Sequence, residues 1–184
     1  ALGAPIEFMD LETIKSTFGQ NGIQDYIEFP NGFGEFTDDT QMSLFTAEGL
    51  LRAYHRFVLK GIGGALNTIV HHSYLRWLHT QRVPVQKNNI AQGVYDIENG
   101  WLIQQKELHK RRAPGNTCLS ALSSGVAGSI DDPINNSKGC GTIMRVAPVG
   151  LFYWQDNKQA FSVACELSAI THGHPTGYLS AGFF

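Results

Sequence analysis

Apolar residues recur along this chain at the spacings typical of amphipathic helices. From residue 39 to residue 60, large apolar side chains follow one another at intervals of mostly three and four, and Gly61 ends the pattern. The same criterion predicts further helices, over residues 65–81, 101–112, 117–124 (with Asn116 as N-cap) and 158–171. Strands are only weakly indicated, at residues 26–29 and 143–149, and Pro148 interrupts the second. The pattern therefore predicts an all-α, compact multi-helix fold.

Composition narrows the classes of function. The 184 residues are 42% hydrophobic and 16% charged, as in an ordinary globular domain, and a net charge of −2 argues against nucleic acid as a partner. The local basic group Lys106, Lys110, Arg111 and Arg112 is interpreted as the solvated end of the helix at 101–112. No apolar run approaches the roughly 20 residues of a membrane span, so no membrane association is expected.

Three cysteines, Cys118, Cys140 and Cys165, form no C-x-x-C pair and leave one thiol over in any disulfide scheme. A reduced, cytoplasmic protein is the expectation. No linker or repeat divides residues 1–184, which indicates a single domain. Both ends look cut, because the chain starts at Ala1 without methionine and stops at Phe183–Phe184, two apolar residues. We therefore expect a domain truncated at both ends.

The first group of residues that suggests chemistry is Thr37, Asp38 and Asp39, at the entry to the first long helix. Before a helix begins, a hydroxyl and two carboxylates can converge, and such hard oxygen ligands suit Mg²⁺ or Mn²⁺. Threonine and aspartate are also favoured at helix N-caps and in the first turn. On these residues alone, capping is the favoured interpretation and metal binding the alternative.

The second group is the glycine-rich segment 135–145, with Gly139 and Gly141 at its centre. Small residues let a ligand approach the backbone, whose N–H groups can bind a diphosphate, and Arg145 could pair with a phosphate or brace a carboxylate. The segment matches neither the Walker nor the dinucleotide pattern. A surface turn is the alternative.

The third group is His172-Gly173-His174, directly after the helix at 158–171. These histidines could contact a ligand or a metal, or they could close the C-terminus of that helix. The histidines at 71, 72 and 79 lack the i, i+4 spacing of a metal pair and are expected on the surface or in the core.

The order of these motifs is more specific than any one of them. Five segments stand in register along nearly the whole chain: Ala1–Phe8, Thr37–Thr40, Ala113–Thr117, Lys138–Arg145 and Thr171–Pro175. In this order they resemble the ADP-ribosylglycohydrolase family, which includes the dinitrogenase reductase-activating glycohydrolase and the ADP-ribosylarginine hydrolases.

The resemblance implies an all-α fold around two divalent cations, Mg²⁺ or Mn²⁺, in a cleft that holds ADP-ribose. By matching positions, Thr37, Asp38 and Asp39 would be metal ligands, and Glu7 would lie beside the metals as a catalytic residue together with both aspartates. Pro114–Gly115 would shape the wall of the cleft. The residues implied to contact the substrate are Ser137, Lys138, Gly139, Cys140, Gly141, Thr142, Met144 and His172.

The family's remaining metal ligands lie in an Asp-x-Asp-Thr/Ser motif that this chain does not reach. We therefore expect half a metal site here and no hydrolysis by the fragment alone. The implied activity of the full protein is metal-dependent removal of ADP-ribose from protein side chains or from a small ADP-ribose conjugate. Arginine is the expected linkage, with serine-linked and O-acetyl-ADP-ribose as alternatives, and a monomer is expected. A non-catalytic ADP-ribose-binding or immunity protein, or a helical interaction domain without a ligand, would keep the same fold.

Overall fold

The computed structural model describes residues 1–29, 32–90 and 96–184, with Phe29 and Phe33 described by their backbone alone. Helices account for most of its regular structure, and the all-α prediction is confirmed. The α-helices are α1 (Leu11–Phe18), α2 (Asp38–Lys60), α3 (Leu66–Thr80), α4 (Asn116–Ser123), α5 (Ile143–Phe152), α6 (Asn157–Ala169) and α7 (Pro175–Phe183). A minimal antiparallel pair, β1 (Glu28–Phe29) and β2 (Gly32–Phe33), precedes α2.

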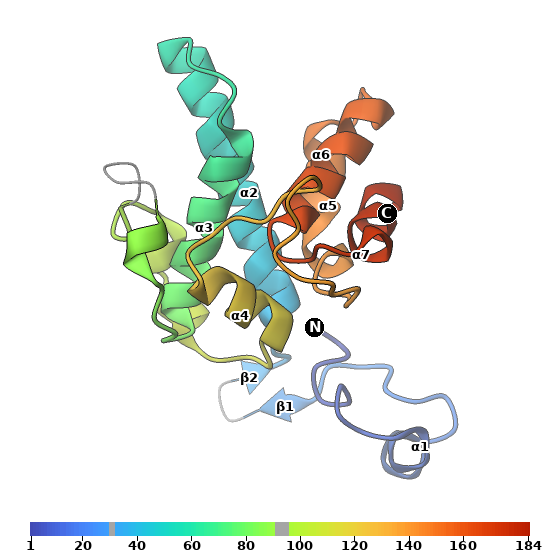
Figure 1. Cartoon of the computed structure of the whole chain (residues 1–184). Coiled ribbons are helices and arrows are strands. Elements are labelled where there is room, and N and C mark those ends of the chain that lie inside the picture. The colour runs from blue at the N-terminus through green and yellow to red at the C-terminus, as the bar shows by residue number, and fades with distance from the viewer. Residues whose placement is uncertain (30–31, 91–95) are drawn as a thin grey trace.

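The long helices α2 and α3 form the centre of the molecule (Figure 1). Gly61 ends α2 in the left-handed conformation, with φ of 65°. A Cβ atom at Gly49 would lie 2.9 Å from the Cα of Val70, so glycine is what lets the two helices approach this closely. Helices α5, α6 and α7 pack together on one side of this pair, α4 lies against α3, and α1 lies apart at the N-terminal end (Figure 1).

The core lies where α2, α3, α5 and α6 meet. Its fully buried side chains include Met42, Phe45, Tyr74, Trp77, Leu78, Leu122, Val149, Leu167 and Ile170. Within residues 1–29, 32–90 and 96–184, no helix combines the length and apolar character that crossing a membrane requires.

The α-helix predicted over residues 101–112 is wrong. The segment forms two short 3-10 helices, η2 (Leu102–Gln104) and η3 (Lys106–His109), and a third, η1 (Lys87–Asn89), lies earlier in the chain. Leu102 and Leu108 are both buried, yet six residues in an α-helix turn through about 600°, so the two side chains would point about 120° apart. Two 3-10 turns direct both leucines into the core.

The strand predicted over residues 143–149 is also wrong, because this segment is the start of α5. Pro148 lies inside the helix and lacks the N–H that would bond the carbonyl oxygen of Met144. The hydroxyl of Ser43 on α2 donates to that carbonyl oxygen instead, at 2.9 Å. The side chain from α2 thus supplies the donor that proline removes, and it joins the two helices.

Candidate functional site

Helix α2 begins at the acidic motif. Thr37 is the N-cap residue with an extended backbone, but its side chain makes no capping hydrogen bond. Asp38 and Asp39 are the first two residues of the helix. The backbone N–H of Asp38 donates to the carbonyl oxygen of Arg112 at 2.9 Å, so the segment before α4 lies across this helix end. The hydroxyl of Thr37 is therefore not used as a cap, which leaves it available to a ligand.

Asp38 carries its carboxylate into the protein. The residue is 3% exposed, and its Oδ2 accepts the backbone N–H of Gly115 at 3.3 Å. Burial raises the pKa of Asp38 to about 6, and the neighbouring charges of Asp39 and Glu7 act in the same direction. The charges of Asp39 and Glu7 thus repel that of the buried Asp38 carboxylate, and a bound cation would relieve this repulsion.

The two aspartates do not converge as a pre-helical turn would allow. Both lie in helical residues, so their side chains leave the helix about 100° apart, and Asp38 is buried whereas Asp39 is exposed. Glu7 approaches from the N-terminal segment and lines a cavity of about 310 Å³ together with Thr37 and Arg112. Glu7 and Thr37 thus line one cavity, and the buried Asp38 lies within electrostatic range of Glu7 and of the exposed Asp39.

The donor set suits a hard divalent cation. Thr37, Asp38 and Asp39 offer a hydroxyl and two carboxylates, which are oxygen ligands of the type that Mg²⁺ and Mn²⁺ prefer. In the part of the chain that the structure describes, no three histidine, cysteine, aspartate or glutamate side chains lie close enough together to hold a metal ion. These residues therefore offer suitable ligand atoms but do not by themselves form a coordination sphere.

The basic group before α4 has a different role from the predicted one. Arg112 forms an ion pair with Glu35 and lies over the ring of Phe36, 5.1 Å from its centroid. Lys110 pairs with Glu107 at 2.7 Å, and its carbonyl oxygen accepts the side-chain amide of Gln41 at 2.9 Å. The cluster is not the end of an α-helix. It holds the 110–113 segment against the start of α2.

Helix α4 connects the acidic motif to the glycine-rich segment. Gly115 is its N-cap, one residue before the predicted Asn116, and this places the Gly115 N–H against Asp38. At the second residue of the helix, Thr117 Oγ1 lies 3.2 Å from Ser137 Oγ. The short α4 therefore contacts Asp38 on one side and the glycine-rich segment on the other. The sequence marked Pro114–Gly115 as a turn, but the contact with Asp38 depends on the tertiary fold.

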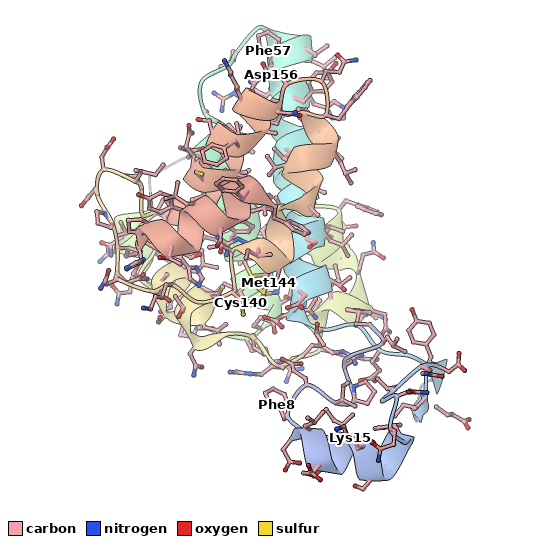
Figure 2. All side chains as sticks on the ribbon, turned by 90° about the vertical axis from the view of Figure 1, so that its right-hand side faces the viewer. Phe8, Lys15, Phe57, Cys140, Met144 and Asp156 are labelled. Carbon is pink, nitrogen blue, oxygen red and sulfur yellow. The ribbon has the colours of Figure 1, made fainter. Side chains whose placement is uncertain are left out.

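The glycine-rich segment forms a loop at the end of the helical body that faces the N-terminal segment. Figure 2 shows Cys140 and Met144 at this end, on the side where Phe8 lies, and Phe57 and Asp156 at the opposite end. Lys138, Gly139 and Cys140 are exposed. The hydroxyl of Ser137 accepts the Gly139 N–H at 3.4 Å, which closes the start of the loop.

Two of the predicted loop residues turn inward. The hydroxyl of Thr142 is fully buried and donates to the carbonyl oxygen of Gly177 on α7 at 2.8 Å. The side chain of Met144 packs partly buried against the core, while its carbonyl accepts the bond from Ser43. Thr142 thus joins the loop to α7, whereas Met144 lies in α5 and joins it to α2, and whether either residue contacts a substrate stays a prediction.

His172 lies under the loop. It is 1% exposed, and a Cβ atom added at Gly141 would lie 2.8 Å from its Cε1 atom. Burial lowers the pKa of His172 to about 4, with a smaller contribution from Arg145, so the ring is neutral at pH 7. His174 plays a different part. Its Nδ1 accepts the Thr176 N–H at 3.0 Å, so it caps the start of α7 and does not close the helix before it.

Arg145 does not reach the surface. Its side chain is 0% exposed, and Nη2 donates to Thr171 Oγ1 at 2.8 Å and to the Leu167 carbonyl oxygen at 3.2 Å. Among the described residues Arg145 pairs with no carboxylate, and its burial keeps the guanidinium from the surface, where a phosphate would bind. His71 and His72 are buried on α3, and burial lowers the pKa of His71 to about 4.

A second cavity, of about 350 Å³, opens between α2 and α3 near their junction. Arg52, Arg56 and Lys60 line it from α2, and no residue predicted for the site lies among its walls. The predicted residues instead gather at the other end of α2.

These features define a helical domain. Its short helix α4 contacts the acidic start of α2 and the glycine-rich loop, and the buried His172 lies under that loop. The sequence model that describes the ADP-ribosylglycohydrolase family matches residues 1–184, and the chain belongs to that family. An uncharacterized protein of Archaeoglobus fulgidus is 27% identical over 161 residues, which are 83% of this chain and 39% of the archaeal protein. The chain thus spans well under half the length of that relative. No solved structure gives a significant match.

Proposed function

We propose that the protein containing this chain hydrolyses the bond between ADP-ribose and a protein side chain, arginine first of all, with Mg²⁺ or Mn²⁺. One observation carries the proposal: Asp38 is buried against Gly115 at the start of α4, and the same helix contacts the glycine-rich loop through Thr117 and Ser137. The buried carboxylate and the glycine-rich loop therefore both contact the start of α4, which supports a site that binds the ribose and the diphosphate of one ligand.

The reaction sets demands that these residues can meet. Water adds to the anomeric carbon of the ribose, the bond to the side chain breaks, and the leaving nitrogen gains a proton. Positive character grows on the ribose as the bond breaks, and the carboxylates of Glu7, Asp38 and Asp39 would stabilise it electrostatically. Glu7, on the N-terminal segment, is the candidate that gives up or accepts the proton.

The candidate ligands of the divalent cations are Thr37, Asp38 and Asp39. When bound, such cations orient sugar hydroxyls and make water a better nucleophile at neutral pH. The Gly115 N–H fixes the orientation of the Asp38 carboxylate through Oδ2. The loop from Ser137 to Met144 is assigned to the diphosphate, whose binding energy positions the reacting carbon from a distance.

The test is release of ADP-ribose by the gene product that carries this chain. Arginine-linked, serine-linked and O-acetyl-ADP-ribose substrates are compared with Mg²⁺ or Mn²⁺, then with chelator. The proposal expects release from the arginine conjugate that chelator abolishes. Release from another linkage alone would correct the substrate. Binding of ADP-ribose without release from any conjugate would make the protein a non-catalytic ADP-ribose binder, and neither binding nor release would refute the proposal.

A further inference from the structure

A chain of three side chains joins the core to the loop. Arg145 on α5 is fully buried, and its Nη2 donates to Thr171 Oγ1 at 2.8 Å. Thr171 Oγ1 lies 2.8 Å from His172 Nδ1, and Thr171 is itself 0% exposed. The hydroxyl oxygen therefore bridges the guanidinium and the imidazole. What it donates and accepts decides which ring nitrogen of His172 carries the proton.

Several contacts fix the position of the guanidinium. The carbonyl oxygens of Leu167 and Ser168 accept from Nη2 at 3.2 and 3.5 Å, at the C-terminal end of α6. The guanidinium carbon also lies 4.6 Å from the centroid of the Tyr74 ring, on α3. Arg145 is thus held by α3, α6 and the 171–172 turn at once, and it cannot move without breaking these contacts.

The direction of the bonds follows from the donor inventory. A guanidinium only donates, so Thr171 Oγ1 accepts from Arg145 and its own proton is free to be donated. Two acceptors compete for that proton, His172 Nδ1 and the sulfur of Cys118. Burial raises the pKa of the Cys118 thiol, which keeps its own proton, and a neutral thiol sulfur is a weak acceptor. The imidazole Nδ1 of His172 is the stronger acceptor, so the Thr171 hydroxyl donates to it.

The positive charge of Arg145 also favours the His172 tautomer that is unprotonated on Nδ1. In a neutral imidazole the nitrogen without a proton is the negative end of the ring dipole. His172 turns Nδ1 toward Thr171 and, behind it, toward the buried cation. The tautomer with a lone pair on Nδ1 is therefore favoured over the one with a proton there.

We propose that Arg145, acting through Thr171, fixes His172 as the tautomer protonated on Nε2, and that this N–H donates to an anionic oxygen of the bound ligand. Nε2 faces the loop: Cβ atoms added at Gly139 and Gly141 would lie 3.5 and 3.1 Å from it. Diphosphate oxygens only accept hydrogen bonds, so a lone pair at Nε2 would repel them. The ligand part rests on the proposed function, and Arg145 is a positioning residue.

Nitrogen NMR of the protein with ¹⁵N-labelled histidine tests the tautomer without any ligand. The His172 signals are assigned by their loss in His172→Gln. We expect a protonated Nε2 and an unprotonated Nδ1 in the wild type and in Thr171→Ser, which keeps the hydroxyl. Thr171→Val, which is close in shape but has no hydroxyl, should shift the ring toward the other tautomer. A wild-type ring protonated on Nδ1 overturns the proposal, whatever the two Thr171 variants show.

Affinity for ADP-ribose tests the ligand part in the same three proteins. Loss of one hydrogen bond to a charged group should weaken binding roughly 10- to 100-fold in Thr171→Val, with recovery in Thr171→Ser. Equal affinity of Thr171→Val and wild type overturns the donor role while leaving the proposed function intact. If the wild type has the expected tautomer but binds no ADP-ribose, the proposed function fails and the tautomer assignment stands.

Discussion

The backbone N–H of Gly115 donates to Asp38 Oδ2 at 3.3 Å, although the two residues are 77 positions apart in the sequence. This contact places a buried carboxylate at the start of α2 against the start of α4. Gly115 is the N-cap of α4, and its N–H is one that the helix itself leaves without a partner. The N–H of Gly115 at the start of α4 thus orients the carboxylate of Asp38 at the start of α2.

Asp38→Asn should make the protein more stable when divalent cations are removed by chelator. Asparagine has the same shape and can still accept the Gly115 N–H, but it removes a desolvated charge beside Asp39 and Glu7. We expect a gain of about 1–3 kcal/mol in the free energy of unfolding at pH 8, because burial has raised the pKa of Asp38 to about 6. Urea denaturation measures it, and the exposed Asp131→Asn is the control. Destabilisation by Asp38→Asn alone would show that the charge is compensated in the fold.

Gly141→Ala should weaken ADP-ribose binding at least about 10-fold, and it should destabilise the fold by about 1–3 kcal/mol. The added Cβ would lie 2.8 Å from His172 Cε1 and 2.9 Å from Cys118 Sγ, so the loop or the histidine must move. Gly150→Ala is the matched control: nothing lies within 4 Å of a Cβ there, and alanine inside α5 should stabilise the helix by up to about 1 kcal/mol. Calorimetric titration with ADP-ribose and thermal denaturation give both quantities. Unchanged affinity in Gly141→Ala would separate the loop from the ligand site.

The protein should lose stability as the pH falls from 6.5 toward 4. Burial lowers the pKa of His71 and of His172 to about 4, so each ring stays neutral in the folded state while the unfolded chain takes up protons below pH 6.5. The stabilisation is complete above pH 6.5 and is lost as the pH approaches 4. His71→Leu should reduce the loss between pH 7.5 and pH 5 by about 2 kcal/mol, as urea unfolding at the two pH values would show. An identical pH dependence in wild type and variant would place the titrating groups elsewhere.

Ser43 and Pro148 should behave as a coupled pair. Ser43→Ala leaves the Met144 carbonyl oxygen without its donor, which should cost about 1 kcal/mol of stability. Pro148→Ala restores the backbone N–H that can reach this carbonyl within α5. In the Pro148→Ala background, Ser43→Ala should therefore cost less, with a coupling of about 0.5–1 kcal/mol. A double-mutant cycle measured by urea denaturation decides this, and strict additivity would rule out the compensation.

Periodicity alone predicted much of the helical frame. The predicted helices 39–60, 65–81 and 158–171 correspond to α2, α3 and α6 within two residues at each end, because each buries one apolar stripe against a neighbour. Periodicity did not indicate α1, α5 and α7. Capping signals mark two of them: Asp10 accepts the Thr13 N–H at the start of α1, and His174 precedes Pro175 at the first position of α7.

The candidate site could be predicted from the sequence as a set of motifs, but the arrangement of these motifs in space could not. Thr37, Asp38 and Asp39 could be marked from their oxygen ligands, and the 137–144 loop from its small residues. The burial of Asp38 and the inward turn of Arg145 depend on contacts with residues about 20 to 80 positions away, such as Gly115, Arg112 and Thr171. Such contacts cannot be predicted from the local sequence.

The most direct test of the proposed function is ADP-ribose release by the gene product that carries this chain, measured for wild type, Asp38→Asn and Asp131→Asn. We predict that an ADP-ribosylated arginine substrate is hydrolysed with Mg²⁺ or Mn²⁺ by the wild type and by Asp131→Asn. Asp38→Asn should lose at least about 100-fold in rate while remaining folded, because its amide replaces a carboxylate ligand. Hydrolysis by Asp38→Asn at the wild-type rate would contradict the proposed role of this carboxylate.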